Sequence, residues 1–223
     1  MDFNILFNDK DIVVCIKPQG IISQSDSKGK ENMVDLLCKK TNNNVFPVHR
    51  LDKETGGIMV FAKSQKVAAA LSRQIIENKF KKEYLALIHN NICPESGEII
   101  DLLFWDRQRN KSFVVKKERK GVKKAILKYE KLCYIKNQNI DLSLIKVLLL
   151  TGRTHQIRVQ FSNRGYPLVG DNRYGARDSE KQLGLWACKL SFYHPITNEL
   201  LSFESLPYNS SVFDIINFNE VLI

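Results

Sequence analysis

The sequence has no apolar segment long enough to span a membrane. A transmembrane helix needs ~20 consecutive apolar residues, and the nearest candidate, 142–150, is interrupted by Lys146. The first ten residues alternate apolar side chains with Asn and Asp, and they do not have the basic-then-apolar layout of a secretion signal. We therefore expect a cytoplasmic protein that makes no membrane contact.

Cysteine is sparse, and its spacing shows no pairing. The chain has no C-x-x-C pair, and its five cysteines are spread far apart: Cys15, Cys38, Cys93, Cys133 and Cys188. This pattern is typical of reduced thiols in a cytosolic protein rather than of disulfides or a zinc site. A Walker A loop and a G-x-G-x-x-G fingerprint are also missing. We expect neither a metal nor a cofactor.

The chain of 223 residues has ordinary globular composition, with 43% hydrophobic and 26% charged residues. Apolar runs at 4–7 and 12–16 predict an opening β-hairpin, so we expect no separate N-terminal domain and a single domain over residues 1–223. Helices are expected at 31–40, from the N-cap Ser64 to Asn78, from the N-cap Thr154 to Gly165, and from Pro207 onward. Further strands are expected at 84–89, 98–103, 111–115, 125–132, 140–150, 186–193 and 199–203. The pattern favours an α+β fold with one continuous sheet.

Positive charge is concentrated in one stretch, residues 107–124. The chain carries a net charge of +10, and this stretch, with nine basic residues and one acid, accounts for +8 of it. Such a concentration attracts a polyanion, of which nucleic acid is the commonest. The alternative interpretation is a solvated lysine-rich loop.

Two polar segments are candidates for chemistry. The first, 49–57, places Asp52 close to Arg50 in a turn-rich loop. A guanidinium lowers the pKa of a nearby carboxyl below its usual value of ~4, which would make Asp52 a nucleophile or charge stabiliser; a turn aspartate that caps local amides is equally compatible. The second, 151–158, is predicted to place Thr154 and Arg158 on one helix face, and a cation near a helix N-terminus suggests an anionic partner.

These segments belong to an ordered set of motifs that resembles the RluA-type pseudouridine synthases. The chain carries HRLD at 49–52 with Thr55 and Gly57, K-x-Y-x-A at 82–86, and GRTHQIRV at 152–159. It continues with G-x-P-x-x-GD-x-x-YG at 165–175 and L-x-F-x-HP at 190–195. Five motifs in the family's order cover essentially the whole chain.

The resemblance implies a pseudouridine synthase fold: one long mixed, mainly antiparallel sheet flanked by helices, with the catalytic cleft at its centre. It also implies isomerisation of specific uridines to pseudouridine in structured RNA, either 23S-type rRNA or tRNA, without a cofactor. By resemblance, Asp52 is the catalytic carboxylate, Arg158 pairs with it, and Tyr84 stacks on the flipped uracil. Substrate-binding residues are expected to be His49, Arg50, Arg153, Thr154, Lys116, Lys117, Arg119 and Lys120.

Other motif residues are expected to have structural or supporting roles. We assign His155 to a hydrogen bond at a helix start, and His194, Trp186 and Phe192 to structure. Asp171 and Tyr174 lie in a predicted turn, where a supporting role is expected rather than direct chemistry.

The chain departs from the family pattern at two positions, Gly56, where Ser is usual, and Gln160, where His is usual. We also expect it to lack the S4 RNA-binding module that many members carry, and to act as a monomer with RNA as its partner. Two alternatives remain: a catalytically silent RNA-binding protein, and a hydrolase that releases free uracil.

Overall fold

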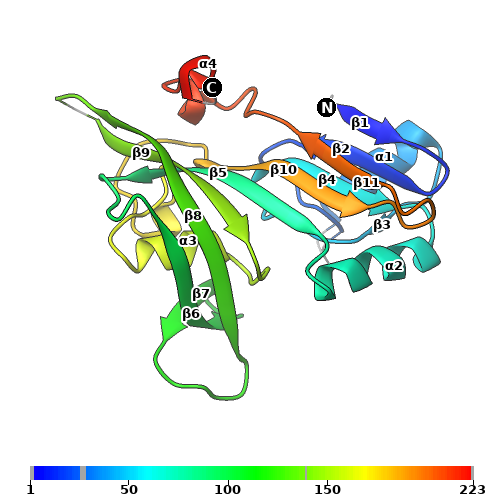
Figure 1. The fold of residues 1–223 in the computed structure, drawn as a ribbon, viewed down its shortest axis with the longest axis horizontal. Helices are drawn as coiled ribbons and strands as arrows, with labels where there is room; N and C mark the ends of the chain where they lie inside the picture. Colours follow the sequence, from blue (N-terminus) through cyan, green and yellow to red (C-terminus); the bar gives the residue numbers. More distant parts are fainter. Residues whose placement is uncertain (1–2, 26–28, 139, 222–223) are drawn as a thin grey trace. The chain divides into compact units, whose positions relative to one another are not determined.

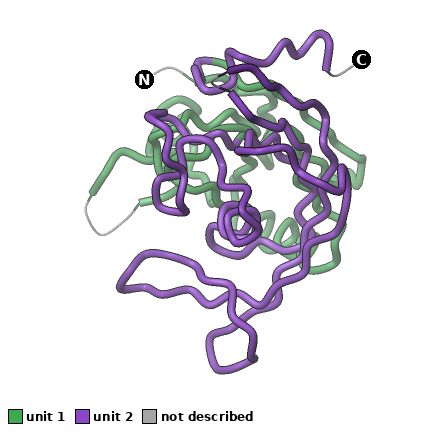
Figure 2. The backbone as a smooth tube through the Cα atoms, turned by 90° about the vertical axis from the view of Figure 1, so that its left-hand side faces the viewer, with its two compact units in different colours: residues 1–82, 186–208 green, residues 83–185, 209–223 purple. Residues whose placement is uncertain are grey.

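The computed structural model describes residues 3–25, 29–138 and 140–221. Its strands and helices are labelled in Figure 1. Contacts divide the chain into two compact units, which Figure 2 colours green and purple: unit 1 comprises residues 1–82 and 186–208, and unit 2 comprises residues 83–185 and 209–223. The single catalytic domain over 1–223 stays a prediction.

Unit 1 is a mixed sheet with two helices. Its strands follow the order β1-β2-β4-β10, with β3 paired to β4 and β11 paired to β10. The pairs are antiparallel except β4 with β10, which is parallel. Its elements are β1 (Ile5–Asn8), β2 (Ile12–Lys17), α1 (Met33–Thr41), β3 (Phe46–Pro47), β4 (Gly56–Ala62), α2 (Gln65–Ile76), β10 (Leu185–Tyr193) and β11 (Leu200–Glu204).

The core of unit 1 forms because β4 is buried along its whole length between β2 and β10. Helix α2 covers this layer with Val67 and Leu71, one helical turn apart, and its N-cap Ser64 accepts a hydrogen bond from the Val67 amide. The rings of Phe80 and Phe192 stack with centroids 5.4 Å apart. The helix predicted from Ser64 is therefore confirmed.

Unit 2 contains a sheet of long strands in the order β5-β9-β8-β6-β7. The pairs β6 with β7, β6 with β8, and β8 with β9 are antiparallel. Its elements are β5 (Lys81–His89), β6 (Ser96–Asp106), β7 (Lys111–Val115), β8 (Val122–Lys136), β9 (Asp141–Leu149), α3 (Gln156–Ser162), the 3₁₀ turns η1 (Asn172–Tyr174) and η2 (Ser211–Phe213), and α4 (Phe218–Val221). The α+β class with mixed, mainly antiparallel strands is confirmed.

Two predicted helix boundaries are wrong. Thr154 is not an N-cap: the chain turns at His155, which has a φ of 54°, and α3 begins at Gln156. Among the residues that the structure describes, the N-cap His155 makes no side-chain capping hydrogen bond, and the Gln156 side-chain oxygen accepts the Arg153 amide, which lies before the helix, at 3.0 Å. The helix predicted to start at Pro207 is also absent, because Asn209 takes a left-handed φ of 52° and the segment continues as the short turns η2 and α4.

Candidate active site

Asp52 lies in the connection between β3 and β4, at the first position of a tight turn. The Thr55 amide donates to the Asp52 carbonyl at 3.1 Å, which closes the turn over residues 52–55, hereafter the Asp52 turn. The Asp52 side chain is partly exposed, whereas Leu51 before it and Thr55 after it are buried. The backbone therefore presents the carboxylate at the surface of unit 1 from a buried base.

Ser23 holds the residue immediately before Asp52. Its hydroxyl donates to the Leu51 carbonyl at 2.8 Å and accepts the Leu51 amide at 3.0 Å. Ser23 is 4% exposed, so both bonds form out of competition with water. Because both backbone polar groups of Leu51 are tied to one hydroxyl, the chain entering the Asp52 turn is fixed.

Lys17 holds the residue immediately after Asp52. Its ammonium group donates to the carbonyls of Lys53 at 3.2 Å, Pro18 at 2.8 Å and Ile21 at 2.6 Å, and the Gly20 amide also donates to the Lys53 carbonyl. Burial lowers the pKa of Lys17 to about 7, and the negative charges of Asp52 and Glu54 oppose that shift. Lys17 is fully buried at the end of β2. It couples the position of the Asp52 turn to the sheet.

Sequence reasoning missed Lys17 and Ser23. The sequence does contain a signal for Lys17, since this lysine directly follows the apolar run of a strand. A lysine that is buried there needs hydrogen-bond partners. Ser23 gave no such signal, because its partner Leu51 is 28 residues away.

We expect replacement of Lys17 by Met to remove a pH-dependent part of the stability. The folded chain releases the Lys17 proton near pH 7, whereas the unfolded chain keeps it to about pH 10. The unfolded state therefore binds more protons between these values, and wild-type stability gains up to about 1 kcal/mol per pH unit. Urea unfolding at pH 7.5, 8.5 and 9.5 measures the free energy of unfolding of both proteins. The wild-type value minus the variant value should rise with pH.

Replacement of Lys10 by Met is the matched control, because it removes an exposed lysine rather than a buried one. A flat difference for the Lys17 variant would mean that the three carbonyls keep Lys17 protonated throughout the range.

His49 and Arg50 precede the Asp52 turn. The His49 ring packs edge-on against Phe80, and its Nε2 accepts the Val60 amide at 3.3 Å. Burial and the charge of Lys82 lower the pKa of His49 to about 3, so the ring is neutral. Arg50 is exposed. These contacts give His49 a packing role, and substrate binding by His49 and Arg50 stays a prediction.

Tyr84 and Arg158 belong to unit 2, whereas Asp52 belongs to unit 1. Tyr84 lies on β5, and its side chain is only 6% exposed. Its stacking on a uracil stays a prediction.

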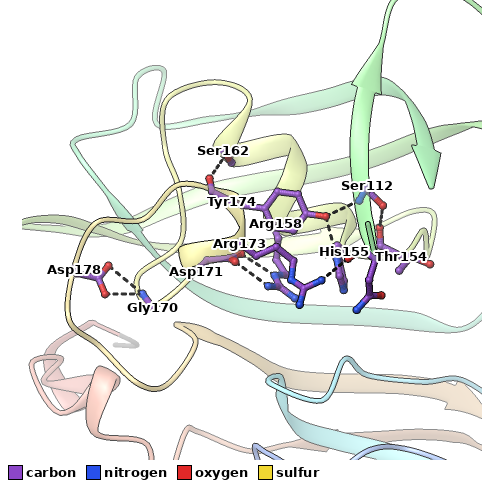
Figure 3. Close-up of polar contacts among 11 residues, drawn as sticks. Ser112, Thr154, His155, Arg158, Ser162, Gly170, Asp171, Arg173, Tyr174 and Asp178 are labelled. Carbon is purple, nitrogen blue, oxygen red and sulfur yellow. Dashed lines mark hydrogen bonds and ion pairs between the residues drawn. The ribbon is translucent and has the colours of Figure 1, made fainter. Parts of the chain in front are cut away.

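Arg158 lies on α3 and forms a buried ion pair with Asp171 (Figure 3). Its Nε donates to Asp171 Oδ2 at 2.7 Å and its Nη2 donates to Oδ1 at 2.8 Å. Arg158 and Asp171 are 4% and 1% exposed. The bidentate geometry uses one edge of the guanidinium and fixes its plane. The pairing of Arg158 with Asp52, which the resemblance implies, stays a prediction.

Asp171 is itself held by a second carboxylate. Asp178 accepts the amide of Gly170, the neighbour of Asp171, at 3.1 Å, and it contacts His89 Nε2 at 2.6 Å (Figure 3 shows the contact with Gly170). Burial opposes ionisation of Asp178, but hydrogen bonds from His89, Gly170 and Glu180 outweigh it, and its pKa is lowered. The sequence analysis expected a supporting role for Asp171 in this turn but did not identify Arg158 as its partner, which lies 13 residues earlier in the chain.

Arg153 and Thr154 connect α3 to the neighbouring strands. Arg153 Nε donates to the Lys124 carbonyl at 3.0 Å, and the Thr154 carbonyl accepts the Ser112 hydroxyl at 2.6 Å. Both residues are partly exposed. The structure brings them to the base of the basic stretch, where contact with RNA stays a prediction.

The basic stretch folds as a hairpin followed by a loop. The turn 107–110 joins β6 to β7, and the loop 116–121 joins β7 to β8 at the lower end of the green strands in Figure 1. The predicted RNA-binding side chains of this loop are all exposed: Lys116, Lys117, Arg119 and Lys120. Arg119 also lies over the Phe104 ring, 4.7 Å from its centroid. A cation therefore lies beside an aromatic ring in this loop, a combination that suits contact with a nucleic acid.

Comparison with known proteins decides the family. Residues 11–163, more than half of the chain, match the family model described as RNA pseudouridylate synthase. The chain belongs to this family.

The relatives agree with this assignment. The chain is 35% identical over 207 residues to an uncharacterized RNA pseudouridine synthase of Mycoplasma pneumoniae, covering 91% of this chain and 66% of that protein. It is 34% identical over 205 residues to ribosomal large subunit pseudouridine synthase C of Buchnera aphidicola, covering 86% and 62%. The chain thus spans about two thirds of the length of these curated relatives.

Solved structures confirm the pseudouridine synthase fold. Human RNA pseudouridylate synthase domain containing 1 superposes with a TM-score of 0.76 at 22% identity, covering 92% of this chain and 84% of that one. Human RNA pseudouridylate synthase domain containing 4 gives 0.74 at 22% identity, covering 92% and 88%.

The structure explains both departures of this pseudouridine synthase from the family pattern. A Cβ atom on Gly56 would lie 2.3 Å from the Trp186 ring, so Gly56 is required by space rather than by loop freedom. Gln160 is fully buried, and its amide donates to Asp101 at 2.9 Å. Gly56 is thus accommodated by packing within unit 1, and Gln160 by one hydrogen bond within unit 2, which leaves its buried Oε1 without a hydrogen-bond partner among the described residues.

The predicted structural residues also behave as expected. His155 Nδ1 lies 2.9 Å from the Tyr174 hydroxyl, and His194 Nε2 lies 2.9 Å from Asp9 Oδ2. Trp186 and Phe192 are 2% and 0% exposed.

One group of possible metal ligands exists in the described part of the chain: Asp9, Asp11 and His194. Asp9 also accepts the amides of Asp11 and Ile12 in the β1–β2 turn. These contacts explain the group as a hairpin cap. A cavity of about 250 Å³ in unit 2, between His89, Asp178 and the segment 211–215, has none of the predicted site residues in its lining.

In 3–25, 29–138 and 140–221, no helix has the length and apolar character needed to cross a bilayer.

Proposed function

We propose that this RNA pseudouridine synthase uses Asp52 as its catalytic carboxylate, acting on specific flipped-out uridines of large-subunit rRNA or tRNA. The observation that carries the proposal is the double restraint on the Asp52 turn: Ser23 fixes the backbone before Asp52 and Lys17 fixes it after. A reactive group must be held by its neighbours to be effective, and here the residues on both sides of a partly exposed carboxylate are held by hydrogen bonds from the buried side chains of Ser23 and Lys17.

The reaction exchanges one glycosidic bond for another. The bond between uracil N1 and ribose C1′ breaks, the uracil turns, and a bond forms between C5 and C1′; the C5 proton is lost and N1 gains one. Asp52 is the group that adds to ribose C1′ or to uracil C6. Arg158 supplies a fixed positive charge that steadies the carboxylate, and Tyr84 stacks on the uracil.

The RNA class follows from general chemistry and from the relatives. Uridines in loops are the accessible targets, because unpaired bases are extruded at the lowest cost. The Buchnera relative is named for the large ribosomal subunit. We further propose a cytoplasmic monomer, in keeping with five cysteines, all in the described part of the chain, of which none forms a disulfide.

The test is incubation of the purified chain with transcribed tRNA and large-subunit rRNA fragments, followed by pseudouridine mapping and by assay of free uracil. Pseudouridine at defined positions without free uracil supports the proposal. Release of uracil would identify a hydrolase, and RNA binding without either product would identify a silent binding protein.

The loop 116–121 is expected to contribute RNA affinity without base specificity. Replacing Lys116, Lys117, Arg119 and Lys120 by Ser should raise KM roughly tenfold. The slope of log affinity against log salt concentration should become less steep by up to about 3, at roughly 0.7 for each single-strand phosphate contact that is lost. The rate at saturating RNA should change little, because none of the four is a catalytic residue.

A matched control removes the same charge from exposed lysines of unit 1: Lys10, Lys30, Lys39 and Lys66. Equal effects of both sets would show that net charge alone attracts the RNA, and an unchanged affinity in the loop variant would make 116–121 a solvated loop.

A further inference from the structure

Tyr174 lies between two cations of different kinds. Its ring centroid is 5.2 Å from the Arg158 guanidinium carbon and 5.0 Å from Lys111 Nζ, which belongs to β7. The residue is 4% exposed. Cation–π attraction to a desolvated ring is favourable for both partners, so the ring physically joins α3, where Arg158 lies, to the basic hairpin.

The Tyr174 hydroxyl makes the same connection by hydrogen bonds (Figure 3). It accepts the Ser112 amide of β7 at 2.7 Å and lies 2.9 Å from His155 Nδ1. A buried hydroxyl is costly to leave unpaired, so the hydroxyl end of the ring cannot shift without breaking these bonds. The position of the ring beside Arg158 therefore depends on the position of β7.

Further contacts tie the hairpin to the same region. The Ser112 hydroxyl donates to the Thr154 carbonyl at 2.6 Å, and Arg173 donates to the Asn110 carbonyl at the hairpin turn. Asp171, two residues before Arg173, fixes the plane of the Arg158 guanidinium. Movement of β7 is thus transmitted to both the ring and the carboxylate that hold Arg158.

We propose that Tyr174 is a positioning residue that couples RNA seated on the β6–β7 hairpin to the orientation of Arg158. The inference rests on the proposed function, because the orientation of Arg158 affects the rate only if Arg158 supports pseudouridine formation. The competing explanation is purely structural: Tyr174 packs in a core cluster with Leu103, Ala125 and Val159.

A double-mutant cycle on single-turnover rates at saturating RNA separates these explanations. Tyr174→Phe keeps the ring and removes the hydroxyl, and a hairpin variant replaces the exposed Arg107 and Arg109 by Ser. We expect each change alone to lower the rate about fivefold, the effect of one ordinary hydrogen bond. Together they should lower it no more than either alone, because both break one connection.

The matched control is Tyr129→Phe, which removes a hydroxyl that donates to the Pro94 carbonyl on the same sheet. It should leave the rate unchanged. Ser112→Ala is the second test, since it removes the Thr154 bond but not the core ring, and it should show the same non-additivity with the hairpin variant. Thermal unfolding confirms that each variant is folded.

A wild type that forms pseudouridine, with rate effects that multiply in the cycle, would overturn the coupling and leave the proposed function intact. Equal single-turnover rates for Tyr174→Phe and Tyr129→Phe would also overturn the coupling. A wild type that forms no pseudouridine in any RNA would overturn both.

Discussion

Replacing Asp52 by Asn is expected to reduce pseudouridine formation by at least about a thousandfold, with RNA affinity within about twofold of wild type. The amide has nearly the same shape as the carboxylate but cannot act as a nucleophile, and loss of a catalytic nucleophile typically costs this much or more. Affinity should persist because phosphate contacts, rather than the reacting group, supply most of it.

Asparagine at position 52 keeps the backbone bonds that fix the turn. The turn is closed by the Asp52 backbone carbonyl, and Ser23 and Lys17 bond to the backbone of Leu51 and Lys53. Glu54→Gln is the matched control, because Glu54 is an exposed carboxylate in the same turn. A Glu54 variant that loses as much activity as the Asp52 variant would move the catalytic role away from Asp52.

Replacing Asp171 by Ala is expected to lower the free energy of unfolding by about 3–5 kcal/mol. The change leaves the guanidinium of Arg158 buried without the carboxylate that uses its Nε and Nη2 donors, and an uncompensated buried charge costs this much. Glu204→Ala, which breaks the exposed pair with Lys189, should cost less than about 1 kcal/mol. Urea unfolding of the three proteins measures both values.

A second variant separates stability from catalysis in this pair. Replacing Arg158 by Met together with Asp171 by Leu removes both charges, and apolar replacements of a buried pair are often neutral for stability. We expect most of the stability to return while activity stays lost, because the charge of Arg158 is gone. Restored activity in this double variant would contradict the role proposed for Arg158.

Local sequence patterns predicted much of the fold. The opening hairpin, the helix capped by Ser64 and the strand β7 are set by turn residues and side-chain periodicity within a few residues, which are visible in sequence. The start of α3 was misplaced because the chain takes a left-handed φ of 54° at His155, directly after Thr154, and the helix begins only at Gln156. The prediction of a C-terminal helix from Pro207 was wrong because Asn209 has a left-handed backbone conformation, which interrupts helical geometry.

The candidate site was predictable only in part, for a physical reason. Asp52 and Arg158 belong to contiguous motifs, and these are recognisable in the sequence. Their supports are not contiguous: Lys17 reaches Lys53 across 36 residues, and Asp171 lies 13 residues after Arg158. Such contacts are produced by tertiary packing, which a local pattern does not encode.

The most direct measurement is a pseudouridine map of RNA from cells that lack the gene, complemented with either wild type or the Asp52→Asn variant. Asp52-dependent catalysis predicts that defined rRNA or tRNA positions lose pseudouridine in the deletion, regain it with wild type, and stay as uridine with the variant expressed at equal level. Restoration of those positions by the Asp52→Asn variant would contradict it.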